Sequence, residues 1–253
     1  MYHYLLRVLP RPVLIELSVR LRSVLELLYQ GNRFTDPING KSYRSFLPYG
    51  QVAQTKRHNV LAPGTLSLER HRLMWLYLQQ ETDFFTSSAK VLHIAPEQCF
   101  YKRFRKLKQE QYITADYNSP IADIHFDLHH APFEDNSFEV IFCNHVLEHV
   151  EDDKQCMQEL YRIMKPGGWA ILQVPVDYHS AFTLEDERYN TDELREIHYW
   201  QKDHVRLYGR DYPDKLRAAG FSVEENDLVS RLDPALVEQY RLDRKEILYI
   251  ARK

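Results

Sequence analysis

The chain has 253 residues, with 33 Lys and Arg against 36 Asp and Glu, and its formal net charge is −3 at pH 7. This length accommodates one full α/β domain and a small extra segment, but not two complete enzyme domains. So small a net charge excludes a general electrostatic attraction to nucleic acid or anionic lipid, and any basic surface must be local.

The cysteines and the N-terminal segment bear on location. Cys99, Cys143 and Cys156 are odd in number and have no C-x-x-C spacing, which is typical of a reducing compartment and favours the cytoplasm. The apolar stretch 5–28 is interrupted throughout by Arg and Glu, so we expect neither a signal peptide nor stable membrane insertion.

The first part of the chain predicts a small extension, residues 1–66. Leucines at three- and four-residue intervals predict an amphipathic helix over 12–30. Residues 31–66 are rich in Gly, Pro, Asn and Ser and predict an irregular, loop-built segment. Ser67 then provides a start signal for a helix that runs to about residue 80. The main domain, residues 67–253, begins with this helix.

From Lys90 onward, strand and helix patterns alternate, which predicts an α/β fold with a doubly wound, mostly parallel sheet. A sheet of this kind binds its ligand at the carboxyl ends of the strands. The expected strands are 91–95, 112–115, 121–126, 139–143, 169–174, 221–225 and 247–251, and the expected helices are 98–108, 152–164 and 212–219. The turn 165–168 is expected to end the second of these helices.

The turn after the first strand is the first candidate for a cofactor site. In doubly wound folds a nucleotide-type cofactor meets this turn, here Ala95, Pro96 and Glu97 after His93. Such a turn normally contains glycines, so an ordinary strand-to-helix turn remains the alternative. A nicotinamide dehydrogenase is disfavoured because G-x-G-x-x-G is absent.

Asp116 ends the second strand of the main domain, roughly 20 positions after His93, where an acid binds ribose hydroxyls in such folds. The alternative is a turn-forming Asp beside Asn118 and Pro120.

Three further motifs make it possible to compare the sequence with a known family. They are D-L-H-H-A-P-F at 127–133, N-H-V-L-E-H-V at 144–150 and L-Y-R-I-M-K-P-G-G at 160–168. With the preceding strands they resemble the core of a class I methyltransferase of the small-molecule type. The resemblance implies a Rossmann-like, seven-stranded sheet with an antiparallel final hairpin, S-adenosylmethionine as methyl donor and S-adenosylhomocysteine as product.

The resemblance also implies roles for individual residues. Asp116, followed by Tyr117, would bind the ribose; Asp127 would accept from the adenine amino group, and Leu128 would add a backbone contact and apolar cover. Asn144 and His145 would lie beside the methionine part and the methyl group, and Ala95, Pro96 and Glu97 would lie beneath the methionine part.

This sequence departs from the family at the first turn. The family usually has an acid at the position of His93 and glycines at the positions of Ala95, Glu97 and Cys99. We hypothesise that Glu97 replaces the lost acid and binds the ammonium group of the cofactor.

A second resemblance concerns residues 34–70, which are similar to a zinc ribbon that precedes this domain in some relatives. The four cysteine positions correspond here to Asp36, Asn39, Ala62 and Thr65, so no thiolate is available and no metal site is expected. Aromatic and apolar side chains are expected to hold the segment instead: Phe34, Tyr43, Phe46, Leu47 and Tyr49.

Residues 176–210 are expected to cover the acceptor site. His145, His204 and Tyr208 are the candidate catalytic groups, while Arg206 and His149 are candidates for binding the acceptor. A hydrogen-bonded lid without proton transfer is the alternative for 203–209.

These features predict transfer of a methyl group, by in-line displacement, to a small-molecule or lipid-like acceptor. The alternative is a catalytically inactive member of the fold that acts as a binding or regulatory module. A nucleic-acid substrate is disfavoured by the acidic balance, despite the local basic run 102–108.

Overall fold

The computed structural model describes residues 22–50 and 56–253, and the chain divides into two compact units. The hairpin unit comprises Met1–Phe85 and Asp227–Glu246; the sheet unit comprises Thr86–Asn226 and Ile247–Lys253. The boundary expected after residue 66 therefore lies inside the hairpin unit, which also takes in helix α3 (Glu69–Gln80). Residues 22–29 are helical, and the earlier part of the predicted helix 12–30 lies outside the described residues.

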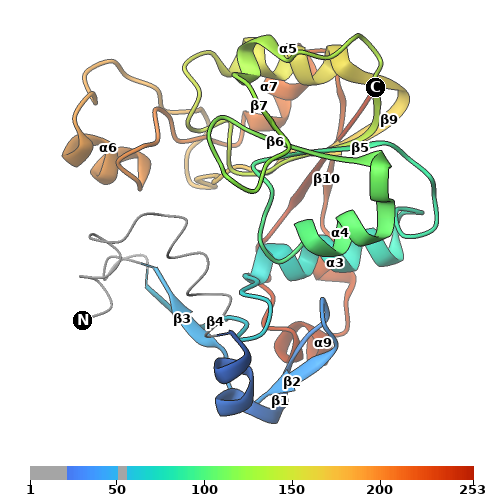
Figure 1. The fold of residues 1–253 in the computed structure, drawn as a ribbon. Coiled ribbons are helices and arrows are strands. Elements are labelled where there is room, and N and C mark those ends of the chain that lie inside the picture. The colour runs from blue at the N-terminus through green and yellow to red at the C-terminus, as the bar shows by residue number, and fades with distance from the viewer. Residues whose placement is uncertain (1–21, 51–55) are drawn as a thin grey trace. The chain divides into compact units, whose positions relative to one another are not determined.

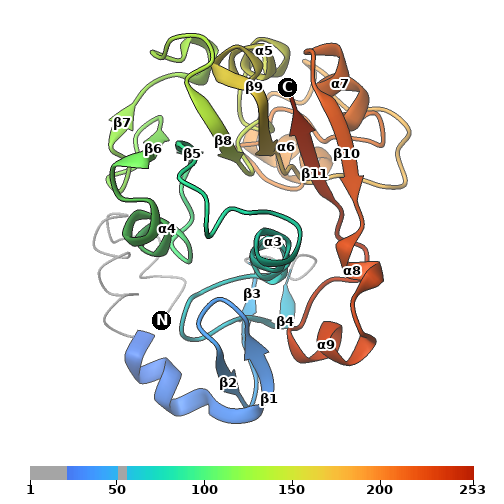
Figure 2. The ribbon, with the colours of Figure 1, turned by 90° about the vertical axis from the view of Figure 1, so that its right-hand side faces the viewer.

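The sheet unit is built on seven strands in the order β10-β11-β9-β8-β5-β6-β7 (Figures 1 and 2). Neighbours from β9 to β7 pair in parallel, whereas β11 runs antiparallel to both β9 and β10. The predicted mostly parallel sheet with an antiparallel final hairpin is thus confirmed. The strands are β5 (Val91–Ile94), β6 (Tyr112–Asp116), β7 (Ile124–His125), β8 (Phe138–Cys143), β9 (Met164–Ile171), β10 (Ser222–Asn226) and β11 (Leu248–Arg252).

Helices cover both faces of this sheet. Helix α4 (Tyr101–Lys108) lies on one face, and α5 (Asp153–Ile163) and α7 (Tyr212–Ala218) lie on the other (Figure 1). All four residues of β5 are buried, as expected for a parallel strand covered on both faces. No helix among residues 22–50 and 56–253 has the length and apolar character needed to cross a membrane.

Some elements differ from the sequence prediction. Strand β9 begins at Met164 and takes in the K-P-G-G segment that was expected to be a turn, with an irregular register against β8 and Gly167 at φ +79°. Strand β7 has only two residues, Ile124 and His125. Helix α6 (Asp192–Tyr199) forms in the segment after residue 175, where Thr191 caps it through a hydrogen bond from the Leu194 amide.

The hairpin unit contains more strand than the sequence indicated. Residues 31–66 were expected to be irregular, but they form two antiparallel hairpins, because Phe34, Tyr43, Phe46 and Ala62 supply a small buried core. Tyr49, also expected in this core, is 45% exposed. The elements are β1 (Gln30–Asp36), β2 (Lys41–Tyr43), β3 (Leu47–Tyr49), β4 (Arg57–Leu61), α8 (Leu228–Arg231) and α9 (Pro234–Gln239).

A buried polar cluster joins the two hairpins near the positions compared with zinc ligands. The Thr65 hydroxyl donates to Asp36, and the Ser67 hydroxyl donates to the same carboxylate oxygen at 3.3 Å. Burial raises the pKa of Asp36, although the Thr65 hydrogen bond and the charge of Arg72 oppose that shift. Hydrogen bonds from side chains thus link segments that a metal links in the zinc ribbon, and the kinship with that module stays a prediction.

Arg72 connects this cluster to the rest of its unit. Its guanidinium is fully buried and donates to the backbone carbonyls of Val60, Ser67, Tyr240 and Arg241 at 2.6–3.0 Å. Because a buried cation needs every donor occupied, these carbonyls are held in one arrangement.

We expect Arg72→Ala to destabilise the hairpin unit by roughly 3–5 kcal/mol, since the carbonyls would lose a buried charged donor. Amide hydrogen exchange would rise in α3 and β4, whereas Lys56→Ala, which changes an exposed side chain of the same unit, serves as the control. Equal exchange in the two variants would show that Arg72 does not hold the unit together.

Candidate functional site

The order of the strands defines where a ligand site is expected. Strand β5 lies between β6 and β8, so the chain leaves β5 in one direction for β6 and β7 and returns to its other side with β8. A crevice forms at the carboxyl ends of the strands at such a switch point. The residues that follow β5 and β8 are 95–97 and 144–145, and they belong to the predicted cofactor site.

A hydrogen-bonded chain crosses this switch point. His93 in β5 is fully buried; its Nδ1 lies 2.6 Å from the Tyr112 hydroxyl, and its Nε2 pairs with Glu97 Oε2. The Asn144 amide, after β8, donates to Glu97 Oε1 at 3.0 Å. Both oxygens of Glu97 are therefore held by donors from two neighbouring strands, which places a carboxylate at the edge where the family's acid is expected.

The backbone is strained at the same two strand ends. Ala95 has φ +50° and His145 has φ +55°, a left-handed conformation that costs a non-glycine residue about 1–2 kcal/mol. The Ala95 amide donates to Ala115 at 2.8 Å and the His145 amide to Gln173 at 2.7 Å, so neighbouring strands hold both conformations. Strain at this point is typical of a functional turn.

Asp116 at the end of β6 shapes the loop that follows. Its Oδ1 accepts the amides of Asn118 and Ser119 at 2.9 and 2.8 Å. Its Oδ2 has no hydrogen-bond partner among the described residues and remains available as an acceptor. The predicted turn-forming role and a ligand role are therefore compatible. The neighbouring Tyr117 side chain is 74% exposed.

Asp127 precedes the short helix η2 (Leu128–His130) and caps it. Its Oδ1 accepts the His129 amide at 3.0 Å and the His129 ring at 2.5 Å. These bonds from His129 lower the pKa of Asp127, so this carboxylate is ionised near neutral pH. Leu128, by contrast, is buried in the core.

His145 pairs with an acid that the sequence analysis did not single out. Its Nδ1 lies 3.2 Å from Glu148 Oε1, and the Glu148 side chain is only 1% exposed. Burial raises the pKa of Glu148, but the hydrogen bond from His145 and the nearby imidazoles outweigh it, so the net pKa is lowered. Glu148 could have been found in the sequence, because an acid within the apolar run V-L-E-H-V is expected to be buried and paired.

The segment after β9 is held against the loop after β8 by Arg206, which is 1% exposed. Its guanidinium donates to the carbonyls of Leu147, Val150 and Glu151 at 2.5–2.8 Å and to both oxygens of Glu185 at 2.9–3.0 Å. All five donors are occupied by Arg206's own chain, so none is available to an acceptor in this geometry.

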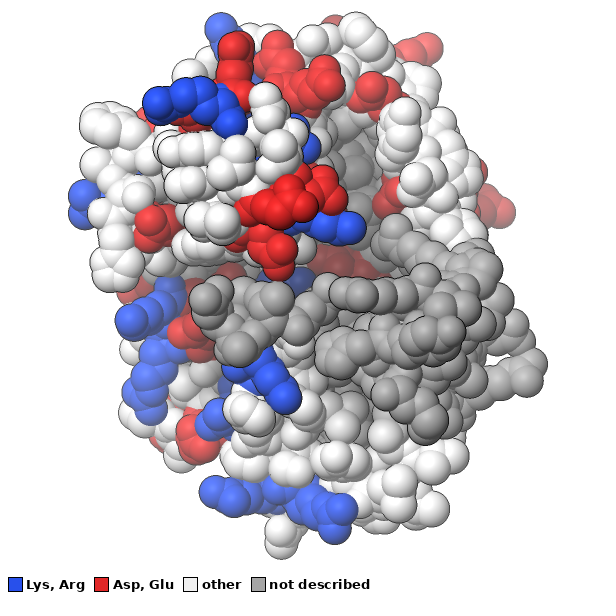
Figure 3. Space-filling view, turned by 90° about the vertical axis from the view of Figure 1, so that its left-hand side faces the viewer, with Lys and Arg blue, Asp and Glu red and all other residues white. Residues whose placement is uncertain are grey.

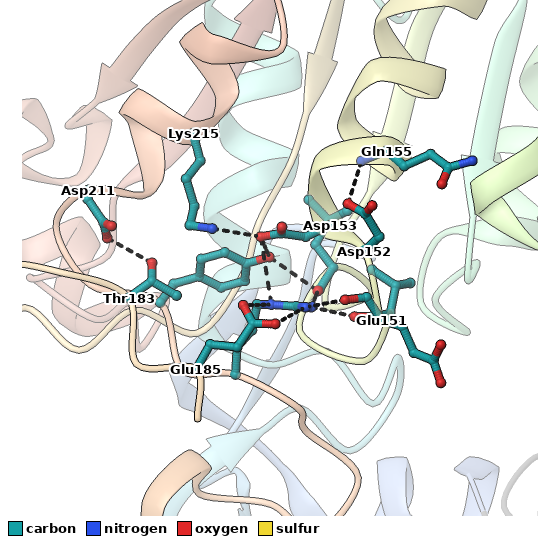
Figure 4. Close-up of polar contacts among 12 residues, drawn as sticks. Glu151, Asp152, Asp153, Gln155, Thr183, Glu185, Asp211 and Lys215 are labelled. Atoms are coloured by element: carbon teal, nitrogen blue, oxygen red, sulfur yellow. Dashed lines mark hydrogen bonds and ion pairs between the residues drawn. The ribbon is translucent and has the colours of Figure 1, made fainter. Parts of the chain in front are cut away.

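Figure 4 shows the polar contacts of Asp153, Glu185 and Lys215 in this part of the sheet unit. Tyr208 and Asp153 are buried as well. The Tyr208 hydroxyl donates to Asp153 at 2.8 Å, and Lys215 approaches the same carboxylate at 3.2 Å. Burial and the charge of Asp153 raise the pKa of Tyr208 well above its usual range, so its hydroxyl remains protonated. His204 is 1% exposed, with its Nδ1 on the Tyr199 carbonyl at 2.9 Å.

The surface of the 176–210 segment is acidic. Figure 3 views the side of the molecule on which α6 lies and shows Asp and Glu side chains there, with Lys and Arg side chains beside them. The exposed acids of this segment include Glu185, Glu187, Asp192, Glu193 and Glu196. Such a surface repels phosphates, which disfavours a nucleic-acid partner at this segment.

Comparisons with known proteins give partial matches to methyltransferases. A family described as "Methyltransferase domain" matches residues 76–172. Demethylmenaquinone methyltransferase from Listeria monocytogenes is 35% identical over 69 residues, which are 27% of this chain and 29% of that protein. Phosphoethanolamine N-methyltransferase 2 from Caenorhabditis elegans is 21% identical over 122 residues, 47% of this chain and 26% of that protein. The chain thus aligns with less than a third of either relative.

Among solved structures, an S-adenosylmethionine-dependent methyltransferase from Mesorhizobium loti has a TM-score of 0.42 and 16% identity. The alignment covers 71% of this chain and 97% of that structure.

We expect Arg206→Ala to lower stability by about 2–4 kcal/mol, because three carbonyls and Glu185 would lose a buried charged donor. Amide hydrogen exchange would rise over 145–151 and 184–208. Arg210→Ala, at an exposed arginine of the same segment, should change stability by less than about 0.5 kcal/mol. Unchanged exchange over 145–151 in Arg206→Ala would contradict the assigned role.

Proposed function

We propose that this chain, which carries a class I methyltransferase domain, transfers a methyl group from S-adenosylmethionine to a small-molecule or lipid-like acceptor. One observation carries the proposal: His93 and Asn144 hold the Glu97 carboxylate at the switch point of the sheet. A carboxylate in that position matches the ammonium group of the cofactor's methionine part. Glu97 thereby supplies the carboxylate that, in the family, an acid at the position of His93 usually supplies.

The remaining contacts follow the carboxyl ends of the strands. Asp116 binds the ribose through Oδ2, the oxygen that its own loop leaves available. Tyr117, an exposed aromatic side chain beside it, offers apolar cover for the base, and Asp127 accepts from the adenine amino group. Ala95 and Pro96 bring the backbone close to the methionine part, and the backbone of Leu128 adds a contact to the base.

When bound, the cofactor supplies an electrophilic methyl group, so the chain has to align an acceptor and exclude water. His145 is the best placed of the three candidate catalytic groups, because its side chain is 29% exposed while those of His204 and Tyr208 are buried. Glu148 orients the His145 ring through Nδ1, and the segment 176–210, which Arg206 holds against the loop after β8, would cover the acceptor.

The acceptor class rests on two arguments. The names of the relatives, a demethylmenaquinone and a phosphoethanolamine methyltransferase, are those of enzymes for small acceptors. The acidic surface of the cover segment disfavours nucleic acid. The three cysteines are buried and have no C-x-x-C spacing, which fits a reducing compartment, and we propose the cytoplasm on that ground.

A catalytically inactive binding module is the competing function, and the loss of glycines at Ala95, Glu97 and Cys99 favours it. The two functions differ in whether the cofactor binds at all, so a binding measurement separates them before any acceptor is known.

Calorimetric titration of the protein with S-adenosylmethionine and S-adenosylhomocysteine should give micromolar affinity, on the order of −8 kcal/mol. Asp116→Ala should weaken both by about tenfold to a hundredfold, because a charged acceptor for the ribose hydroxyls is lost. Asp214→Ala, at an exposed position of α7, is the control. Absence of binding to the intact protein would favour the inactive module; unchanged binding to Asp116→Ala would remove only the ribose assignment.

The role of Glu97 is testable with two ligands that differ only where it acts. We expect Glu97→Gln to weaken S-adenosylhomocysteine about tenfold to a hundredfold, since a charge-assisted contact with the ammonium is lost. Binding of 5′-methylthioadenosine, which has the ribose and base but no amino-acid part, should hardly change. Glu134→Gln controls for the loss of an exposed acid. Equal weakening of both ligands would show that Glu97 only shapes the turn.

A further inference from the structure

A second polar cluster lies in the sheet unit, between the loop after β8 and the segment 203–206. One ligand atom each from Glu148, His149 and His204 lies within 4.8 Å of the other two. The amide of Val205 donates to the Glu148 carbonyl at 2.9 Å, so the two segments that carry the cluster are tied together by backbone. None of the hydrogen bonds described above for the cofactor site involves His149 or His204.

Two atoms of the cluster are buried without partners. Glu148 Oε2 and His204 Nε2 are shielded from solvent, and neither has a hydrogen-bond partner among the described residues. Both side chains are only 1% exposed. A buried acceptor left without a donor costs about 1–3 kcal/mol of stability. Two such acceptors side by side, Glu148 Oε2 and His204 Nε2, therefore point to a bound cation or donor between them.

The hydrogen bonds of the two imidazoles identify which nitrogens are available. His204 Nδ1 lies 2.9 Å from the Tyr199 carbonyl, and His149 Nδ1 lies 3.0 Å from the Asp203 carbonyl. A carbonyl only accepts, so Nδ1 carries the proton on both rings and each Nε2 presents a lone pair. Histidines that bind metals are typically oriented by this same Nδ1 bond to a backbone carbonyl.

The carboxylate completes the set of donors. Glu148 uses Oε1 for His145, which leaves Oε2 facing no donor. Two imidazoles and one carboxylate are a donor set for a divalent transition metal such as zinc, and not for magnesium or calcium.

We propose that Glu148, His149 and His204 bind a divalent transition-metal ion of the zinc class. Bonds of about 2.0–2.1 Å in a tetrahedral site set ligand atoms about 3.4 Å apart, so atoms that now lie within 4.8 Å of one another close by up to about 1.4 Å on binding. His149 can make this movement, because its side chain is 34% exposed while the other two are fixed. Three protein ligands leave a coordination position for an acceptor oxygen or nitrogen, a role that rests on the proposed methyl transfer.

Arg206 prepares this site. Its donors hold the carbonyls of Leu147 and Val150, the residues on either side of Glu148 and His149, and it lies two positions after His204. The same buried guanidinium that holds the segment after β9 therefore fixes the backbone beside Glu148 and His149 before the ion arrives, while the His149 side chain remains able to move.

The test is zinc binding by the purified, chelator-treated protein in the absence of S-adenosylmethionine, measured by equilibrium dialysis and metal analysis. We expect about one equivalent of zinc, and cobalt should give the visible absorption of a four- or five-coordinate ion. His149→Ala, a change at a partly exposed side chain, should weaken zinc binding at least about a hundredfold, and Glu148→Gln should do the same.

His179→Ala, at an exposed histidine outside the cluster, and Glu134→Gln are the matched controls, and circular dichroism verifies that every variant is folded. Zinc binding that persists in His149→Ala and Glu148→Gln would overturn the proposal. A wild-type protein that binds no zinc would also overturn it, and a water bridging Glu148 Oε2 and His204 Nε2 would then explain the two buried acceptors. Cofactor titration of the same samples reports separately on the methyltransferase function.

Discussion

The geometry of the candidate site depends on one buried cation, the guanidinium of Arg206. A charge taken out of water is tolerated only when each donor is occupied, and Arg206 meets this condition with three backbone carbonyls and Glu185. The loop after β8 has no regular backbone pairing of its own, so these bonds give it one conformation. The loop carries Glu148 and His149, and its conformation places them beside His204.

The turn after β5 shows how the fold accommodates a changed motif. Glycines usually give this turn its freedom, and an acid in the strand usually faces the cofactor. Here an imidazole occupies the strand position, and we propose that Glu97, four residues later, supplies the carboxylate; His93 and Asn144 orient it. The positive φ of Ala95 is the conformational cost, and bonds to neighbouring strands offset it.

The hairpin unit follows a related logic. Where the zinc ribbon relies on four thiolates, this chain has a buried carboxylate, two hydroxyls and Arg72, whose donors reach four carbonyls. Hydrogen bonds of this kind replace coordination only if every member is satisfied, because an unpaired buried charge is costly. Loss of either Asp36 or Arg72 would therefore leave the other as a buried charge without its counter-charge.

The sequence by itself determined the alternation of strands and helices from β5 onward and the acids at the strand ends, Asp116 and Asp127. Those features follow from local periodicity and spacing, which are written in neighbouring residues. The sequence did not predict the four strands of the segment 31–66, because short hairpins rich in polar residues lack a clear alternation of apolar and polar residues. These hairpins form around a core of Phe34, Tyr43 and Phe46.

Only the tertiary structure decided which polar residues meet. Glu97 and Asn144 are 47 positions apart, and Arg206 and Val150 are 56 apart, so no local pattern indicates their contact. Arg206 and Tyr208 resembled acceptor-binding and catalytic groups in sequence because their chemistry suits those roles. Burial assigned them to holding the chain, since a donor already satisfied inside the protein is not available to a ligand.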